Sequence, residues 1–296
     1  MSPSVMGCLG MFSPAQETVK PAGPRKVLER GLAAFETVRA QLSSSGLRRR
    51  SAARLIYVVR YALIVLYTVI WGGLGCSVGL LDRSGESVVW MARRWVGWIL
   101  ATCGIEVDCA GLESLDPKQP YVLMSNHQSV FDIGAIIATL PISFRFVAKR
   151  ELTWIPFFGW ALVAGGHVII DRGRRERAVR SLRHAAERIR QGTNVIIFPE
   201  GTRSATEALG EFKSGGFHLA IQAGVPVLPI SVSGSRRITP KKSLRIESGR
   251  IRVHYGTPIP TKGLTLEDRS ALKDAVRAAI LGGLDPELQA PPSTGA

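Results

Sequence analysis

The chain has 296 residues, which is enough for one well-packed domain with a membrane anchor and short for two independent enzymes. Its 38 Lys and Arg residues against 23 Asp and Glu give a formal net charge of +15, which indicates an anionic partner: nucleic acid, an anionic bilayer or an acidic substrate. The four cysteines form no CxxC pair and show no zinc-finger spacing, which argues against a metal module and a disulfide framework.

The first 53 residues are rich in Ser, Gly, Pro and Arg and hold little that could form a core. We expect a basic, mostly disordered N-terminal segment with a short helix at residues 26–41. The sequence does not indicate what this segment does.

The segment 54–104 is strongly apolar. Residues 61–81 carry no charge, and 21 residues are enough for a helix to cross the hydrocarbon of a bilayer. Residues 88–105 are instead interrupted by Arg93 and Arg94 and contain three tryptophans, a combination that suits the headgroup zone. We therefore expect a two-helix membrane hairpin in one leaflet; the alternative is one spanning helix followed by a helix of the soluble core. In either case the basic flank before residue 61 favours a cytoplasmic N-terminus.

From residue 105 onward, short apolar runs alternate with helical stretches. The expected strands are residues 105–109, 121–125, 144–148, 167–171, 195–198, 227–233 and 251–255. The expected helices are residues 129–140, 175–191, 215–223 and 266–281. This alternation predicts an α/β fold with a mixed, largely parallel central sheet flanked by helices. The catalytic domain would then comprise residues 105–285, followed by a flexible tail at 286–296.

A first group of reactive side chains, Asn126-His127-Gln128-Ser129-Val130-Phe131-Asp132, stands where an expected strand ends and a helix begins. Ligands of α/β sheets gather at the carboxyl ends of strands. His127 can take the proton of an attacking alcohol, while Asp132 holds the other ring nitrogen and stabilises the imidazolium. Because five helical steps would rotate the two side chains apart, they meet only if His127 precedes the first turn of the helix.

A second group, Phe198-Pro199-Glu200-Gly201-Thr202-Arg203-Ser204, follows another expected strand. Gly201 lets backbone amides approach a ligand, Thr202 supplies a hydroxyl, and Arg203 supplies a fork suited to phosphate. Glu200 could orient the Arg203 guanidinium or bond a substrate oxygen. The group is typical of an anion-binding turn.

Together these groups resemble the first and third motifs of the glycerolipid acyltransferase family, which includes the bacterial 1-acylglycerol-3-phosphate acyltransferases. Residues 166–172 (GHVIIDR) are similar to the second motif, and residues 225–230 (VPVLPI) to the fourth. Residues 149–152 (KREL) and 212–215 (FKSG) resemble the stretches that follow motifs one and three. The resemblance covers residues 105–257, with the motifs in the family's order.

The resemblance implies transfer of a fatty acyl group from acyl-ACP or acyl-CoA to the 2-hydroxyl of lysophosphatidic acid, which forms phosphatidic acid in phospholipid biosynthesis. It implies no metal, no cofactor and no covalent acyl-enzyme. It also implies a membrane-associated protein at the cytoplasmic face of the inner (plasma) membrane. The catalytic residues implied are His127 and Asp132, and the substrate-binding residues are Asn126, Lys149, Arg172, Glu200, Gly201, Thr202 and Arg203.

Two features fall outside this pattern. His167 stands where the family usually has a bulkier apolar residue, which predicts a different pocket beside the phosphate site. Residues 172–190 are rich in arginine, and this helix could rest on anionic headgroups or face solvent. We expect no nucleic acid partner, because no nucleic-acid-binding motif accompanies the charge.

Alternative functions remain open: acylation of another lysolipid, such as a lyso-ornithine lipid or a lysophospholipid with a larger headgroup, or non-catalytic binding of anionic lipid at a membrane. A hydrolase that uses His127 as its base is disfavoured by the absence of a Gly-x-Ser-x-Gly elbow.

Overall fold

The computed structural model describes residues 46–82, 84–171, 175–206 and 208–289. Four sequence-based expectations lie wholly or mostly outside these ranges: the disordered N-terminal segment at 1–53, its helix at 26–41, Arg172 and the C-terminal tail. The chain divides into two compact units, Met1–Ala62 and Leu63–Ala296. In the first unit the described part is the beginning of helix α2 (Gly46–Gly79).

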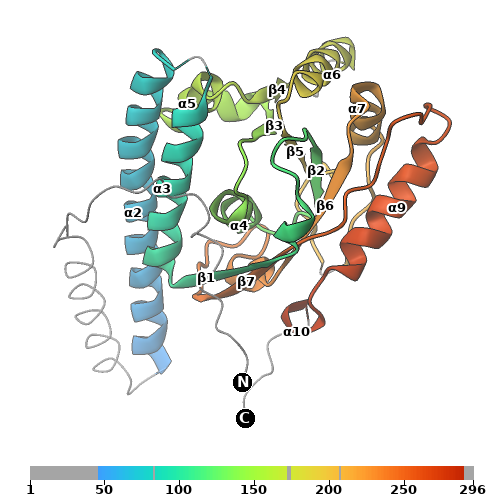
Figure 1. Ribbon diagram of the computed structural model, residues 1–296. Helices are drawn as coiled ribbons and strands as arrows, with labels where there is room; N and C mark the ends of the chain where they lie inside the picture. Colours follow the sequence, from blue (N-terminus) through green and yellow to red (C-terminus); the bar gives the residue numbers. More distant parts are fainter. Residues whose placement is uncertain (1–45, 83, 172–174, 207, 290–296) are drawn as a thin grey trace, which may run out of the picture. The chain divides into compact units, whose positions relative to one another are not determined.

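A seven-stranded sheet forms the centre of the second unit (Figure 1). Its strands are β1 (Ile105–Ala110), β2 (Val122–Ser125), β3 (Arg145–Lys149), β4 (Val168–Ile170), β5 (Val195–Ile197), β6 (Val227–Ser233) and β7 (Gly249–Tyr255). The strand order is β1-β7-β6-β2-β5-β3-β4, and every neighbouring pair is parallel except β6 and β7. The predicted fold class is therefore confirmed.

Helices cover both faces of the sheet, because alternate side chains of each buried strand point to opposite sides. Val122, Met124 and Val195 belong to the core that lies beneath three helices. These helices are α6 (Arg175–Arg190), α7 (Gly215–Ala223) and α9 (Arg269–Gly282). The remaining elements outside the sheet are η1 (Leu112–Ser114), α4 (Phe131–Thr139), η2 (Arg150–Trp154), α5 (Phe158–Ala164), α8 (Ser235–Ile238) and α10 (Pro286–Gln289).

Helix α2 has the length and composition of a membrane span from Ala53 to Gly79, and no other helix in the described ranges passes the same test. Within the second unit, α2 packs against α3 (Glu86–Cys103) through aromatic side chains. The Trp98 ring lies 5.3 Å from both the Tyr67 and the Trp71 rings, and the Tyr67 hydroxyl is 3.1 Å from Oγ1 of Thr102. That both helices lie in a membrane remains a prediction.

Helix α3 differs from a headgroup-zone helix in one respect. Its buried residues include Val89 and Val96, and α3 contacts α4 and β1 of the sheet domain. Arg93 donates two hydrogen bonds of 2.9 Å, one to the carbonyl of Leu140, the C-cap of α4, and one to that of Ile142 just beyond it. This arginine interrupts the apolar pattern because it caps another helix, which the sequence does not reveal.

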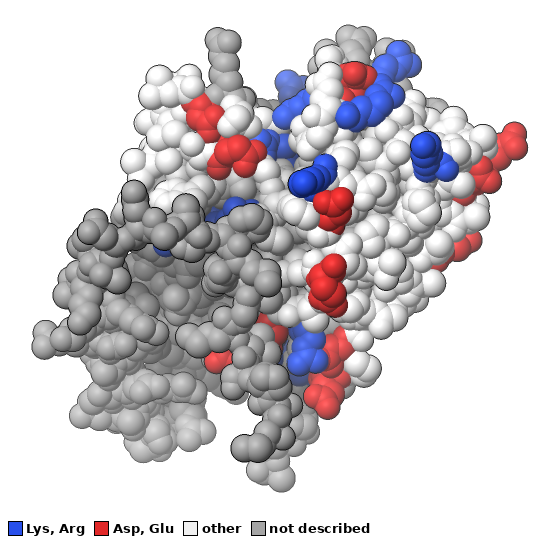
Figure 2. Space-filling view, viewed as in Figure 1, with Lys and Arg blue, Asp and Glu red and all other residues white. Residues whose placement is uncertain are grey.

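Charge is mixed on the visible surface. On the face shown in Figure 2, the described basic and acidic side chains are interspersed. The described Lys and Arg side chains therefore do not form one basic stripe on this face.

Candidate functional site

The loops after β2 and β5 leave the sheet at the same edge. The two strands pair in parallel, with Val122 opposite Val195 and Met124 opposite Ile197. Residues 126–130 and 198–204 therefore begin side by side, at the edge where ligands of α/β sheets are commonly bound. The two motifs lie at residues 126–132 and 198–204, and they meet because of this strand pairing rather than through local structure.

His127 and Asp132 form a hydrogen-bonded pair. Nδ1 of His127 lies 2.9 Å from Oδ2 of Asp132, which is buried in the first turn of α4. The same oxygen accepts the backbone N–H groups of Gln128 at 2.6 Å and Ser129 at 2.8 Å. The carboxylate thus holds both the ring and the turn that carries it, so the chain folds back over the helix start as the five-residue spacing requires.

The rest of the His127 ring is partly exposed. Its side chain is 14% exposed, and Nε2 makes no hydrogen bond to any residue that the structure describes. The ring stacks on Phe198, with centroids 4.2 Å apart and planes at 23°. In a neutral ring that donates from Nδ1 to the carboxylate, Nε2 presents a lone pair.

Glu200 joins the two loops. Its Oε1 accepts the N–H of His127 at 2.7 Å, and its Oε2 accepts the N–H of Gly210 at 3.0 Å. Ser204 in turn donates its N–H to the His127 carbonyl at 2.7 Å. Burial of the carboxylate raises the pKa of Glu200, and the two N–H donors oppose that rise. A Cβ atom at position 210 would lie 2.5 Å from Oε2 of Glu200, which is too close for a side chain. The close approach of this carboxylate therefore requires glycine at position 210.

Asn126 is buried, and its side chain bonds the neighbouring strand. Nδ2 donates to the carbonyl of Val232 at 2.8 Å, and Oδ1 accepts the N–H of Val232 at the same distance. This pair of hydrogen bonds extends the pairing of β2 with β6 by one residue beyond the end of β2. The amide therefore holds the base of the His127 loop.

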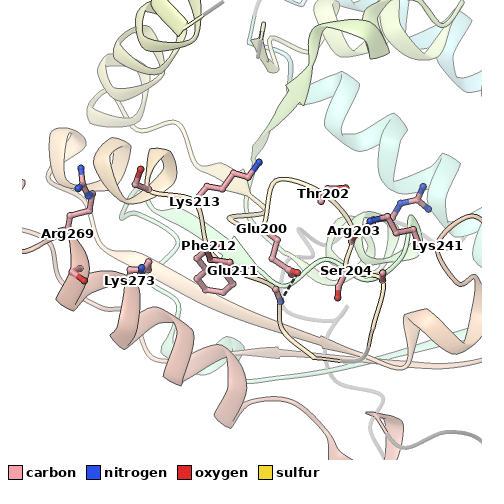
Figure 3. A pocket seen from close by; sticks show the side chains of 14 residues that line it. Glu200, Thr202, Arg203, Ser204, Glu211, Phe212, Lys213, Lys241, Arg269 and Lys273 are labelled. Atoms are coloured by element: carbon pink, nitrogen blue, oxygen red, sulfur yellow. Dashed lines mark hydrogen bonds between the residues drawn. The ribbon is translucent and has the colours of Figure 1, made fainter. Parts of the chain in front are cut away.

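A cavity of about 730 Å³ lies beside this network (Figure 3). Glu200, Thr202 and Arg203 lie in its wall, and Gly201 makes the turn between them with a φ of 72°. The remaining lining residues are Ser204, Ala205, Gly210, Glu211, Phe212, Lys213, Ser214, Lys241, Arg269, Ser270 and Lys273. Arg203 has no ion pair among the described residues, so its guanidinium is available to an anion.

One predicted phosphate ligand stands apart from this cavity, and another lies outside the described residues. Lys149 is exposed at the end of β3 and does not line it. The Cα of Lys149 is opposite that of Ile170, so this lysine lies at the edge where β4 ends. Arg172 follows shortly after β4 but lies outside the described residues.

Sequence reasoning missed the far side of the site. Lys241 follows α8, and its Nζ donates to the Arg203 carbonyl. Arg269 and Lys273 belong to α9, and their spacing of four residues on a helix was the one available signal. None of these positions falls in a motif.

His167, the departure noted in the sequence, has a structural partner. Its Nδ1 accepts the N–H of Phe146 at 2.8 Å, and its ring stacks on Phe146 with centroids 5.9 Å apart. Burial, followed by the charges of Arg145 and Arg188, lowers the pKa of His167 to about 3. The side chain is therefore neutral at physiological pH.

Within the described ranges, no three His, Cys, Asp or Glu side chains gather closely enough to hold a metal ion. The expectation that the reaction uses no metal and no cofactor remains a prediction.

Comparisons with known proteins agree with one another. A family model described as Acyltransferase matches residues 106–233. Human 1-acyl-sn-glycerol-3-phosphate acyltransferase alpha is 41% identical over 179 residues, which span 60% of this chain and 63% of the human protein. The 1-acyl-sn-glycerol-3-phosphate acyltransferase of Saccharomyces cerevisiae is 31% identical over 244 residues, 78% of either chain. The match thus spans somewhat less than two thirds of the human relative, but more than two thirds of the yeast one.

A solved structure is also similar. The crystal structure of the 1-acyl-sn-glycerophosphate acyltransferase PlsC from Thermotoga maritima matches with a TM-score of 0.69 and 28% identity. The match covers 79% of this chain and 95% of that chain.

Proposed function

The chain belongs to the acyltransferase family, and from that membership we propose that it transfers a fatty acyl group from a thioester donor to the 2-hydroxyl of 1-acyl-sn-glycerol-3-phosphate, forming phosphatidic acid. The observation that carries the proposal is the His127–Asp132 pair, in which Nε2 of His127 has no partner among the described residues. His127 does not line the basic cavity itself, but Glu200, which accepts the His127 N–H, lies in the cavity wall. An acyltransferase needs a base for an alcohol and a site for the acceptor's anionic group, and these residues can supply both.

In the proposed reaction, Nε2 of His127 takes the proton from the acceptor hydroxyl as its oxygen attacks the thioester carbonyl carbon. Asp132 stabilises the imidazolium that forms, because its Oδ2 accepts the Nδ1 proton. When the tetrahedral intermediate collapses, the new C–O ester bond remains and the C–S bond breaks. The leaving thiolate takes the proton back from the imidazolium. No bond forms between the acyl group and the protein.

Glu200 and Asn126 are assigned as positioning residues. Both carboxylate oxygens of Glu200 accept backbone N–H groups, and both polar atoms of the Asn126 side chain bond Val232. These groups have little capacity left for a substrate. Their proposed role is to hold the His127 loop where the imidazole can reach the hydroxyl.

The acceptor phosphate is assigned to Arg203, with the Thr202 hydroxyl and the turn at Gly201. The guanidinium offers a planar pair of donors that matches two phosphate oxygens. Lys149, at the end of strand β3 next to β5, is proposed to contribute, as is Arg172, which lies outside the described residues. We also propose that the protein lies at the cytoplasmic face of the membrane, with helix α2 in the bilayer. This proposal rests on the apolar span Ala53–Gly79.

The first experiment is an acyl-transfer assay on membranes that contain the full chain, with lysophosphatidate, lyso-ornithine lipid and glycerol-3-phosphate as competing acceptors. We expect lysophosphatidate to be preferred and His127→Ala to abolish turnover while the protein remains folded and membrane-bound. His184→Ala, which removes an exposed imidazole, is the matched control. Full turnover by His127→Ala would refute the mechanism, and preference for another acceptor would refute the substrate.

The phosphate assignment has its own experiment. Arg203→Glu should raise the KM for lysophosphatidate more than it lowers kcat, because it removes a ground-state contact that persists in the transition state. Arg245→Glu makes the same charge change at an exposed position outside the cavity. If Arg203→Glu alters neither constant, the phosphate is bound elsewhere.

A further inference from the structure

Helix α9 presents three basic residues at intervals of four, Arg269, Lys273 and Arg277, and they have different surroundings. Arg277 is hydrogen-bonded to the neighbouring loop. Its guanidinium donates to the carbonyls of Gly210 at 2.6 Å and Leu209 at 3.0 Å. It also lies over the Phe212 ring at 5.5 Å. Arg277 therefore holds α9 against the loop that carries the Gly210 N–H bonded to Glu200.

Arg269 and Lys273 have no comparable partner. Both line the cavity, and neither forms a side-chain hydrogen bond or ion pair with a described residue. Like charges four residues apart on one helix face oppose each other and weaken the helix slightly. Folding alone gives no reason to place them together over a cavity, whereas an anionic ligand does.

The cavity also contains more positive charge than one phosphate requires. Arg203, Lys213 and Lys241 join the two α9 side chains, whereas the acidic lining residues are Glu200 and Glu211. Figure 3 shows Arg269 and Lys273 on one side of the cavity, Arg203 and Lys241 on the other, and Lys213 between them. The side formed by α9 lies beyond the Arg203 turn to which the acceptor phosphate is assigned.

We propose that Arg269 and Lys273, with Lys213, bind the phosphate groups at the nucleotide end of a coenzyme A thioester. This inference rests on the proposed function, for which it names the donor. The nucleotide end carries a 3′-phosphate and a diphosphate, so several separated cations can each meet a different group. A concave space of about 730 Å³ has the size of a small-molecule site and favours a nucleotide over the surface of a carrier protein.

The decisive variant is the double substitution Arg269→Gln/Lys273→Gln. With acyl-CoA as donor, its KM should rise about tenfold while kcat stays within about twofold, since two solvent-accessible charge–phosphate contacts are lost. With acyl-pantetheine, which has the same thioester without the nucleotide, the KM should not change. The KM for the lysolipid acceptor should also stay constant. Lys118→Gln/Lys262→Gln removes the same charge at exposed positions outside the cavity and should leave every constant unchanged.

A binding measurement separates this inference from the acyltransferase proposal. Adenosine 3′,5′-bisphosphate should bind the detergent-solubilised full chain in a calorimetric titration. The Kd for this ligand should be about tenfold higher in the double variant. If no lysolipid is acylated but this pattern appears, the proposed function fails and the nucleotide site stands. If acylation proceeds but the bisphosphate does not bind, the site is refuted and the function stands.

Three kinetic results for the double variant would overturn the inference. The KM for acyl-CoA could stay unchanged, the KM for acyl-pantetheine could rise equally, or the only KM to rise could be that for acylated carrier protein. The last would assign the α9 side chains to an acidic protein donor.

Discussion

His127 and His167 lie at the two ends of one row of stacked rings, yet their surroundings differ. His127 stacks on Phe198, Phe198 is parallel to Phe146 at 6.4 Å, and Phe146 stacks on His167. Nδ1 of His127 meets a carboxylate, whereas Nδ1 of His167 accepts a backbone N–H. Two imidazoles in similar apolar contact thus have opposite polar partners.

The charges around the two rings extend this difference. Asp132 is buried against His127, and a positive imidazolium there would be compensated. His167 is half-buried near Arg145 and Arg188, and these cations oppose a further positive charge. The comparison teaches that stacking alone does not set the chemistry of a histidine. The Nδ1 partner and nearby charges, together with burial, separate the histidine proposed as the base from one that stays neutral.

The largest expected effect comes from removing the carboxylate beside His127. Asp132→Asn should lower kcat by on the order of 10³-fold or more, because the amide favours the wrong tautomer and cannot stabilise the imidazolium. Steady-state rates at saturating concentrations of the acceptor would measure this loss of kcat. Asp274→Asn, at an exposed position of α9, is the matched control. A variant that retains more than a tenth of the wild-type kcat would show that Asp132 does not distinguish the two rings.

A smaller effect is expected from Glu200→Gln, which tests how much the hydrogen bond from the His127 N–H to Glu200 stabilises the fold. One amide oxygen cannot replace two carboxylate oxygens, so the N–H of His127 or Gly210 would face an –NH₂ group. We expect a loss of about 2 kcal/mol in the free energy of unfolding, from one unsatisfied buried donor. Denaturant titration would measure it, with the exposed Glu113→Gln as control. A stability equal to wild type would mean that the carboxylate does not brace these loops.

The smallest effect concerns acid stability at His167. Its pKa of about 3 lies below that of an ordinary histidine, so the unfolded chain binds a proton first and stability falls as pH drops below about 6.5. At its steepest, one such proton contributes about 1.4 kcal/mol per pH unit. His167→Gln should therefore lose less stability than wild type between pH 6.5 and pH 5.5, by about 1 kcal/mol. His184→Gln, at an exposed position, should follow the wild type. Parallel curves for His167→Gln and wild type would indicate that His167 is protonated normally in the fold.

Most of the fold was predictable from local pattern. All seven strands overlap their expected ranges, and β6 and α7 match theirs at both ends. Helix α7 ends where Gly224 adopts a φ of 66°, a conformation that favours glycine, so its limit was encoded locally. Helix α5 was missed because it begins after Pro156 and contains Gly159, which are typical turn residues.

The site was predictable only where its residues are close in sequence. The turn between His127 and Asp132 follows from their spacing at a strand end, and the Glu200 motif was recognised as a unit. That Glu200 bonds Gly210 depends on the path of an irregular loop, which has no periodicity to read. The α9 side chains approach the same loop only through tertiary packing, held there by Arg277.

The double hydrogen bond of Asn126 to Val232 has a consequence for the rate of the reaction. A flexible loop would have to become ordered each time a substrate is converted, and that loss of conformational entropy would add to the activation barrier. Because a buried side chain bonds the loop to an inner strand, the ordering occurs once, when the protein folds. In the proposed mechanism, the histidine that follows thus takes its position from the sheet in every catalytic cycle.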